Sequence, residues 1–537
     1  MPVSIFNDVI GPVMRGPSSS HCAAALRIGL LARDLVGGTP DEVVVEFDRA
    51  GSLPTTHESQ GSDMGLFGGL LGWEAADPRL PEGAATLAAA GTTVRFVTSD
   101  CGDPHPNTYR LALRRGAAAH TLRAVSTGGG MIEVIDVDGF GLALHGDAHE
   151  TLLVICGADC RERGEALATR VAATLGSAVD AVTTLDGPSG RMVRVRSREA
   201  LGESRLAPFA ADVDRVRRLA PVLPVLTPPG VVVPFSSAAA LLEADGGRGL
   251  PLWRHAVDYE MRRGGLPEDR VVAMMVDIVR VLRRSIAEGV AGTEYDDRVL
   301  PAQAPGFAAA LAGGRLVGDR VLNRIVLATT ALMEVKSSMG VIVAAPTAGA
   351  CAALPAAVIT LAEEMGHGEE AMARALLAAG LVGVFICTPW SFAAEVGGCQ
   401  AEGGSAAAMA AAAIVTLAGG TLVPALAAAA MAMQSMIGLI CDPVGNRVEV
   451  PCLGKNVMAA ANALACANMA LAGFDEVVPF DQVVETARRV SEQMPRELRC
   501  TALGGLSVTP ASRAVEIRLL ERRAGAAPAP ARGGHRP

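Results

Sequence analysis

The sequence predicts an α+β fold with several domains, because three different patterns follow one another along its 537 residues. Residues 1–150 alternate β-rich and helical runs. Residues 151–220 hold a compact strand–helix–strand–strand pattern and a linker, and residues 235–515 are helical in pattern. A chain of this length can bury a separate core in each part. The last segment, 516–537, is rich in Ala, Gly, Pro and Arg, and we expect it to be disordered.

The elements of the first part are short and bounded by turn residues. The runs at 43–47 and 93–97 are rich in Val and Phe and are predicted to be strands. Residues 23–35 and 65–71 have the apolar spacing of helices. This alternation is typical of an α/β unit.

The second part is predicted from four short runs. Residues 151–156 form a strand, 163–175 an amphipathic helix, and 181–185 and 192–195 two further strands. A unit of this size and order resembles an ACT regulatory domain in shape, and an extension of the first sheet is the alternative. The proline-rich stretch 221–234 then reads as a linker.

The third part is predicted to be all-helical. Residues 271–288 and 321–333 carry clear helical patterns. The run 406–440 is apolar enough to suggest a membrane span, but Gly419, Gly420 and Pro424 interrupt it. We therefore expect a pair of buried helices there.

Composition narrows the function. A net charge of −9 disfavours nucleic-acid binding, because no basic surface would neutralise phosphates. The eleven cysteines lack the dense, even spacing of a secreted disulfide scaffold, and the first residues show no signal-peptide pattern. We expect a cytoplasmic homodimer that binds a small amino-acid substrate, with neither nucleic acid nor membrane as a partner.

Three cysteines stand out near the C-terminal end. Cys399, Cys441 and Cys452 each lie beside Gly or Pro in a turn-forming motif within an alanine-rich region. Structural zinc prefers four ligands, often in Cys-x-x-Cys pairs, and the sequence has no such pair. From spacing alone, two interpretations stay open: an iron–sulfur cluster held by three loops, or ordinary buried cysteines.

Motifs spread over residues 3–510 resemble both parts of the bacterial iron–sulfur-dependent L-serine dehydratases. Those that resemble the α part are Ala345-Pro-Thr-Ala-Gly349, Gly398-Cys-Gln-Ala-Glu402, Cys441-Asp-Pro-Val-Gly445, Val450-Pro-Cys452 and Gly504-Gly505-Leu506. Those that resemble the β part are Pro17-Ser-Ser-Ser-His21, Asp103-Pro-His-Pro-Asn107 and Gly128-Gly-Gly130. Because the motifs occur in order, the resemblance implies both parts fused in one chain.

The resemblance implies a [4Fe–4S] cluster on Cys399, Cys441 and Cys452, with one iron left open for the substrate. Elimination of water from L-serine or a related β-hydroxy amino acid would give an enamine, which hydrolyses to a 2-oxo acid and ammonia. The chemistry agrees, because a Lewis-acidic iron polarises a poor leaving group and a positioned base removes the α-proton. The family also implies an all-helical α part and a β part similar to the substrate-binding domain of phosphoglycerate dehydrogenases.

The same motifs supply the other candidate residues. Candidate catalytic residues are His21, His57, His105 and Lys455. Candidate substrate-binding residues are Ser18, Ser19, Ser20, Asp63, Asn107, Lys336, Thr347 and Gly349. The serines precede a predicted helix, where hydroxyls and free amides suit a carboxylate. Lys336 and Lys455 are the two lysines of the chain, and both fall in motifs.

Several residues depart from the family pattern. The segment that usually reads Gly-His-Gly-Thr-Asp is here Ser59-Gln-Gly-Ser-Asp63, and Gln60 cannot transfer a proton at neutral pH. Cys22, Ala350 and Lys336 are further departures. They leave open a lyase for another β-substituted amino acid, a cluster-dependent desulfidase, or a non-catalytic amino-acid-sensing paralogue. Cys500, the last cysteine, is a further candidate ligand.

Overall fold

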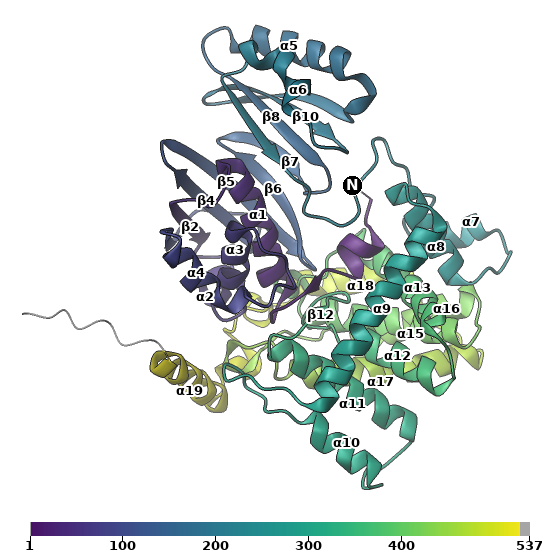
Figure 1. The fold of residues 1–537 in the computed structure, drawn as a ribbon. Coiled ribbons are helices and arrows are strands. Elements are labelled where there is room, and N and C mark those ends of the chain that lie inside the picture. Colours follow the sequence, from purple (N-terminus) through teal and green to yellow (C-terminus); the bar gives the residue numbers. More distant parts are fainter. Residues whose placement is uncertain (1, 527–537) are drawn as a thin grey trace, which may run out of the picture.

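The computed structural model describes residues 2–526 and combines sheets and helices, as expected for an α+β protein (Figure 1). The two larger sheets are built from the first 219 residues, and helices dominate the rest. A two-stranded ladder joins the beginning of the chain to the helical part, pairing β1 (Val13–Met14) with β12 (Ile342–Val343).

A six-stranded sheet has the order β3-β2-β4-β5-β6-β7. Strand β2 runs parallel to β3, and the other neighbouring strands are antiparallel. The predicted strands at 43–47 and 93–97 are present, but the antiparallel run from β4 to β7 was not predicted. The bounds are β2 (Glu42–Asp48), β3 (Thr93–Ser99), β4 (Thr108–Arg115), β5 (Ala118–Gly128), β6 (Met131–Val137) and β7 (Phe140–Leu144).

Helices α1 (Ala24–Val36) and α3 (Ser62–Leu71) pack tightly against each other beside this sheet. Glycines make the approach possible: a Cβ on Gly69 would lie 2.1 Å from the Leu26 carbonyl oxygen, and one on Gly65 would lie 2.0 Å from that of Cys22. The contact fixes the segments that precede both helices, which carry His21 and Gln60. Two shorter helices, α2 (Leu53–Thr56) and α4 (Gly83–Ala89), complete this part.

A second sheet is antiparallel throughout, with the order β11-β8-β10-β9. Helix α5 (Cys160–Leu175) covers it through a small separate core that includes Leu153, Leu167 and Val193. The predicted strand–helix–strand–strand order is confirmed, and β11 is an additional strand. The bounds are β8 (His149–Ile155), β9 (Ala181–Gly187), β10 (Gly190–Ser197) and β11 (Arg215–Leu219), with the short helix α6 (Glu203–Leu206).

The third part is helical, as predicted, apart from β12. Its helices are α7 (Ala238–Asp245), α8 (Leu252–Gly264), α9 (Glu268–Ala291), α10 (Ala304–Ala312), α11 (Arg320–Ser337), α12 (Ala353–Glu364), α13 (Glu369–Cys387), α14 (Ala394–Gly397), α15 (Ser405–Leu417), α16 (Leu422–Gln434), α17 (Cys452–Leu471), α18 (Phe480–Gln493) and α19 (Pro510–Ala526).

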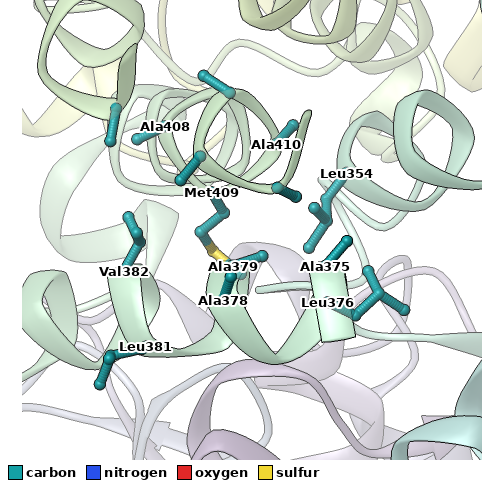
Figure 2. Close-up of a cluster of buried hydrophobic side chains, with 14 of the residues drawn as sticks. Leu354, Ala375, Leu376, Ala378, Ala379, Leu381, Val382, Ala408, Met409 and Ala410 are labelled. Carbon is teal, nitrogen blue, oxygen red and sulfur yellow. The ribbon is translucent and has the colours of Figure 1, made fainter. Parts of the chain in front are cut away.

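Alanine lets these helices pack closely. Figure 2 shows Met409 of α15 reaching towards α13 among small side chains such as Ala378 and Ala408. The run 406–440 forms the buried helices α15 and α16, so that prediction is confirmed. Within residues 2–526, α13 has the length and hydropathy of a membrane span, but 78% of its apolar window is buried inside the protein. That is the environment of a core helix.

The first residues of the chain belong to the helical core. The π-helical turn η1 (Ile5–Val9) is buried against α13. Gly380 and Gly383 leave room for it, because a Cβ at these positions would lie 2.4 Å from Ile5 and 2.1 Å from Val9 side-chain atoms. Glu260 of α8 holds the turn in place through the Ser4 hydroxyl, at 2.6 Å.

The prediction that 516–537 is disordered was wrong for its first part, since α19 continues to Ala526. The helix is anchored by side chains that the composition argument ignored. Leu519 is buried, and the Ser512 hydroxyl accepts a hydrogen bond from the Gly445 amide at 2.8 Å. Residues 527–537 lie outside the described part.

Candidate active site

Four buried thiols gather where the helical part meets the first sheet. The ligand atoms of Cys399, Cys441 and the Glu402 carboxylate all lie within 4.8 Å of one another. The side chain of Cys500 packs in the same small cluster. Cys452, also buried, opens helix α17, and burial together with the nearby Cys399 raises the pKa of its thiol. The structure therefore brings the three predicted ligands together with the further candidate Cys500, and adds Glu402.

Local backbone contacts place each cysteine. The Cys441 amide donates to the Leu498 carbonyl at 2.9 Å, which brings Cys441 beside the segment that carries Cys500. Contact with Cys399 and Cys500, together with burial, raises the pKa of the Cys441 thiol above its ordinary value. A cation would replace the thiol protons, because thiolates are the metal-binding form. This soft, buried donor set fits a metal or iron–sulfur cofactor.

Lys455 lies one turn after Cys452 and holds the cluster from one side. Its ammonium donates to Cys399 Sγ at 3.7 Å, to the Ile440 carbonyl at 2.7 Å and to the Asp442 carboxylate at 2.8 Å. A positive charge here offsets the negative charge of thiolates. Lys336 is buried, and its ammonium donates to the Val448 carbonyl.

The loop around Thr347 and Gly349 supports Glu402. The Thr347 hydroxyl donates to Glu402 Oε1 at 2.6 Å, and a Cβ on Gly349 would lie only 2.7 Å from that oxygen. A larger residue at this position would therefore displace the Glu402 carboxylate. The same loop meets the serine motif, since Ser19 Oγ accepts from the Ala348 amide at 3.2 Å.

The serine–histidine motif is fully engaged with the protein. His21 Nδ1 lies 3.0 Å from Ser18 Oγ and 3.4 Å from Glu395 Oε1, and its Nε2 lies 2.8 Å from Thr56 Oγ1. The Ser20 carbonyl accepts from Ser126 at 2.8 Å. The hydroxyls of Ser18 and Ser19 therefore hold the motif together, instead of lying free for a carboxylate.

Burial keeps His21 neutral. Burial first, and then the nearby His57, lower the pKa of His21 from 6.5 to about 3. The unfolded chain binds a proton there at mildly acidic pH and the folded chain does not, so the stability is complete above pH 6.5 and is lost as the pH falls towards 3.

We expect this effect to be measurable with the His21→Gln variant. Below about pH 6, the free energy of unfolding of the wild-type protein should fall by about 1.4 kcal/mol per pH unit more than that of the variant. Urea unfolding of both proteins at several pH values checks it. Equal slopes would show that His21 is charged in the folded chain.

Two predicted histidines are held by partners other than the thiols. His57 Nδ1 pairs with Asp63 at 2.6 Å, and its ring stacks on Phe96 at 4.8 Å between centroids, so it faces the sheet. His105 accepts from the Asn107 amide at 3.1 Å within its own loop. Asn107 itself is buried and accepts from the Ser52 hydroxyl, beside the His21 network.

Gln60, the clearest departure from the family pattern, lies at the thiol cluster. Its side chain is buried, and its amide donates to Cys500 Sγ at 3.6 Å and to Asn446 at 3.2 Å. An uncharged amide therefore stands where the family motif has histidine. His57 points away from this position and does not replace it.

Two site residues were missed by the sequence analysis, Glu395 and Glu402. Both lie within motifs that contain Cys399, four residues before it and three after it. Glu395 is buried, and within residues 2–526 its Oε2 has no hydrogen-bond partner, as is true of Asn107 Nδ2. Burial and repulsion from Glu402 raise the pKa of Glu395 to about 7, and the Asn107 amide is near enough to oppose this.

Known proteins match both the helical part of this chain and its first part. A family model described as the serine dehydratase alpha chain matches residues 247–507. The probable L-serine dehydratase alpha chain of Bacillus subtilis is 35% identical over 263 residues, which covers 49% of this chain and 88% of the relative. The chain belongs to the serine dehydratase family.

Other members of the family extend the match. The L-serine dehydratase alpha chain of Peptoniphilus asaccharolyticus is 33% identical over 278 residues, covering 51% of this chain and 94% of the relative. The probable L-serine dehydratase beta chain of Bacillus subtilis is 40% identical over 152 residues, covering 28% of this chain and 67% of the relative. One chain therefore has counterparts to two separate chains of that organism.

Proposed function

We propose that this chain is a [4Fe–4S]-dependent lyase that removes water from L-serine, after which the enamine hydrolyses to a 2-oxo acid and ammonia. The main support is the buried thiol cluster. Two buried polar atoms close to it, Glu395 Oε2 and Asn107 Nδ2, have no hydrogen-bond partner among the described residues. Unpaired buried polar groups are costly and are expected where a ligand binds. The names of the relatives support the reaction and the substrate.

Cys399, Cys441 and Cys452 would hold the cluster, which when bound supplies a Lewis-acidic iron that polarises the β-hydroxyl. The chain's own residues then orient the substrate. The Asn107 amide is a hydrogen-bond donor suited to a carboxylate. Burial of the site excludes water, which strengthens each polar contact there.

Gln60 supports a second candidate, a lyase for another β-substituted amino acid, including a desulfidase that acts on cysteine. Its amide lies at the thiol cluster in place of the family's histidine, so the lining nearest the substrate has changed. The contact of Lys455 with the proposed ligand Cys399 favours an altered substrate over loss of turnover.

The proposal is tested by anaerobic purification, an iron and sulfide count, and an assay of 2-oxo acid formation. We expect about four irons and four sulfides per chain, a brown colour, and turnover of L-serine or of one of several β-substituted amino acids offered in parallel. Sulfide release from L-cysteine would identify the desulfidase. A colourless, metal-free protein with full activity would refute the proposal.

We propose that the first sheet forms a substrate-binding domain over residues 1–150, that residues 151–220 form an ACT-like regulatory unit, and that residues 235–515 form the catalytic domain. We propose a cytoplasmic homodimer. The separate core between α5 and the second sheet supports a distinct unit.

A further inference from the structure

The hydrogen bonds around His21 determine which of its nitrogens carries the proton. The Thr56 hydroxyl donates its proton to the Ser52 carbonyl at 2.8 Å. Thr56 Oγ1 can therefore only accept from His21 Nε2, at 2.8 Å. Since the buried ring is neutral, its Nδ1 carries no proton and presents a lone pair.

The Glu395 carboxyl lies beside that nitrogen. His21 Nδ1 lies 3.4 Å from Glu395 Oε1, and Ser18 Oγ is its other neighbour. An acceptor gives an ionised carboxylate no stabilisation, and Oε2 has no donor among the described residues. A buried carboxylate whose donors do not make up for its lost hydration is a stronger base than one in water.

The other groups near Glu395 raise its pKa, lower it or carry no charge. Glu402 repels its charge, and burial is the largest effect. The uncharged thiol of Cys500 and the buried phenol of Tyr109 also interact with it electrostatically. Two groups oppose these effects: the backbone N–H of Glu395 itself and the Asn107 amide, which is a candidate substrate contact.

Glu395 is also well placed for the reaction. It is the second residue of the short helix α14, whose first residue, Ala394, packs on the thiols, and it precedes Cys399 by four residues. Its Oε1 is directed to His21, which leaves Oε2 for a ligand. Gln60 cannot accept a proton, so the site needs a base from another position.

We propose that Glu395 is a catalytic residue, the base that removes the substrate α-proton, and that His21 is a positioning residue that keeps it basic. This inference rests on the proposed function. The Cα–H bond breaks as Oε2 takes the proton, and its electron pair forms the Cα–Cβ double bond. The C–O bond breaks, and the leaving hydroxide recovers the proton from Glu395 to give water.

The test uses the full-length protein and the isosteric variant Glu395→Gln. We expect kcat/KM to fall by roughly a hundredfold or more, while the iron content and the visible spectrum stay those of the wild type. Glu395→Asp, which keeps a carboxylate, should recover part of the rate. Wild-type kcat/KM should fall as the pH is lowered through about 7, because the base must be ionised.

Two readouts separate this inference from the proposed function. In infrared difference spectra between acidic and alkaline pH, the carboxylic-acid C=O signal of the wild type should contain a component that Glu395→Gln lacks, whether or not the protein turns over serine. His21→Asn places an amide donor near Oε1 of Glu395. In this variant, the fall of kcat/KM on the acidic side of the pH profile should occur at lower pH. Normal turnover in Glu395→Gln would refute the role of Glu395, whereas a wild type without cluster would refute the proposed function.

Discussion

Replacing Cys441 with serine should remove the visible absorption of the cluster and lower turnover by roughly a thousandfold. The variant loses Lewis-acid stabilisation of several kcal/mol, and each loss of about 1.4 kcal/mol slows a reaction about tenfold. Cys441 is the thiol that contacts both Cys399 and Cys500, so no other ligand can take its place without moving a loop. Iron and sulfide counts and the 2-oxo acid assay check the result.

Cys466→Ser provides the matched control. Cys466 is also a buried cysteine, and it lies on α17, the helix that Cys452 begins, but its thiol donates to Asn462 within the helix. Its replacement should leave the colour and the iron content unchanged. If Cys441→Ser kept its cluster while Cys466→Ser lost it, the proposed ligand set would be wrong.

The second large effect is expected from Gly69→Ala. The added methyl group would lie 2.1 Å from the Leu26 carbonyl oxygen and 2.8 Å from the Leu30 amide nitrogen, so α1 and α3 must separate. Overpacking against backbone should cost about 3 kcal/mol of the free energy of unfolding. Because these helices carry the segments of His21 and Gln60, activity should fall as well. Urea unfolding and the serine assay measure both effects.

Gly306→Ala controls for the substitution itself. Gly306 also lies in a helix, α10, but a Cβ there meets nothing within 4 Å. Alanine favours a helix over glycine by up to about 1 kcal/mol, so this variant should be as stable as the wild type or slightly more so. Equal destabilisation by both substitutions would mean that the α1–α3 contact is looser than described.

Much of the fold is predictable from local patterns. The helical spacing of 271–288 and the alanine-rich run 406–440 determine buried helices whatever surrounds them, and both were found. The antiparallel strands β4 to β7 were missed because their burial depends on partners in other strands. The position of η1 was missed because its five residues pack on a helix distant in sequence.

The candidate site was predicted in part for similar reasons. Short motifs identified Cys399, Cys441 and Cys452, which lie close together in the structure. They did not show that His57 turns to Phe96, because direction depends on packing within the sheet domain. Glu395 was overlooked because a carboxylate in a motif looks solvated until its burial is known.

The buried opening peptide also bears on how the protein is made and cut. Ile5 and Val9 leave the ribosome long before α13, so their binding groove forms only when most of the chain has been synthesised. If a protease cut the chain within residues 221–234, the two fragments would stay bound to each other, because η1 and the β1–β12 ladder join them. Covalent continuity is thus dispensable for holding the halves of this molecule together.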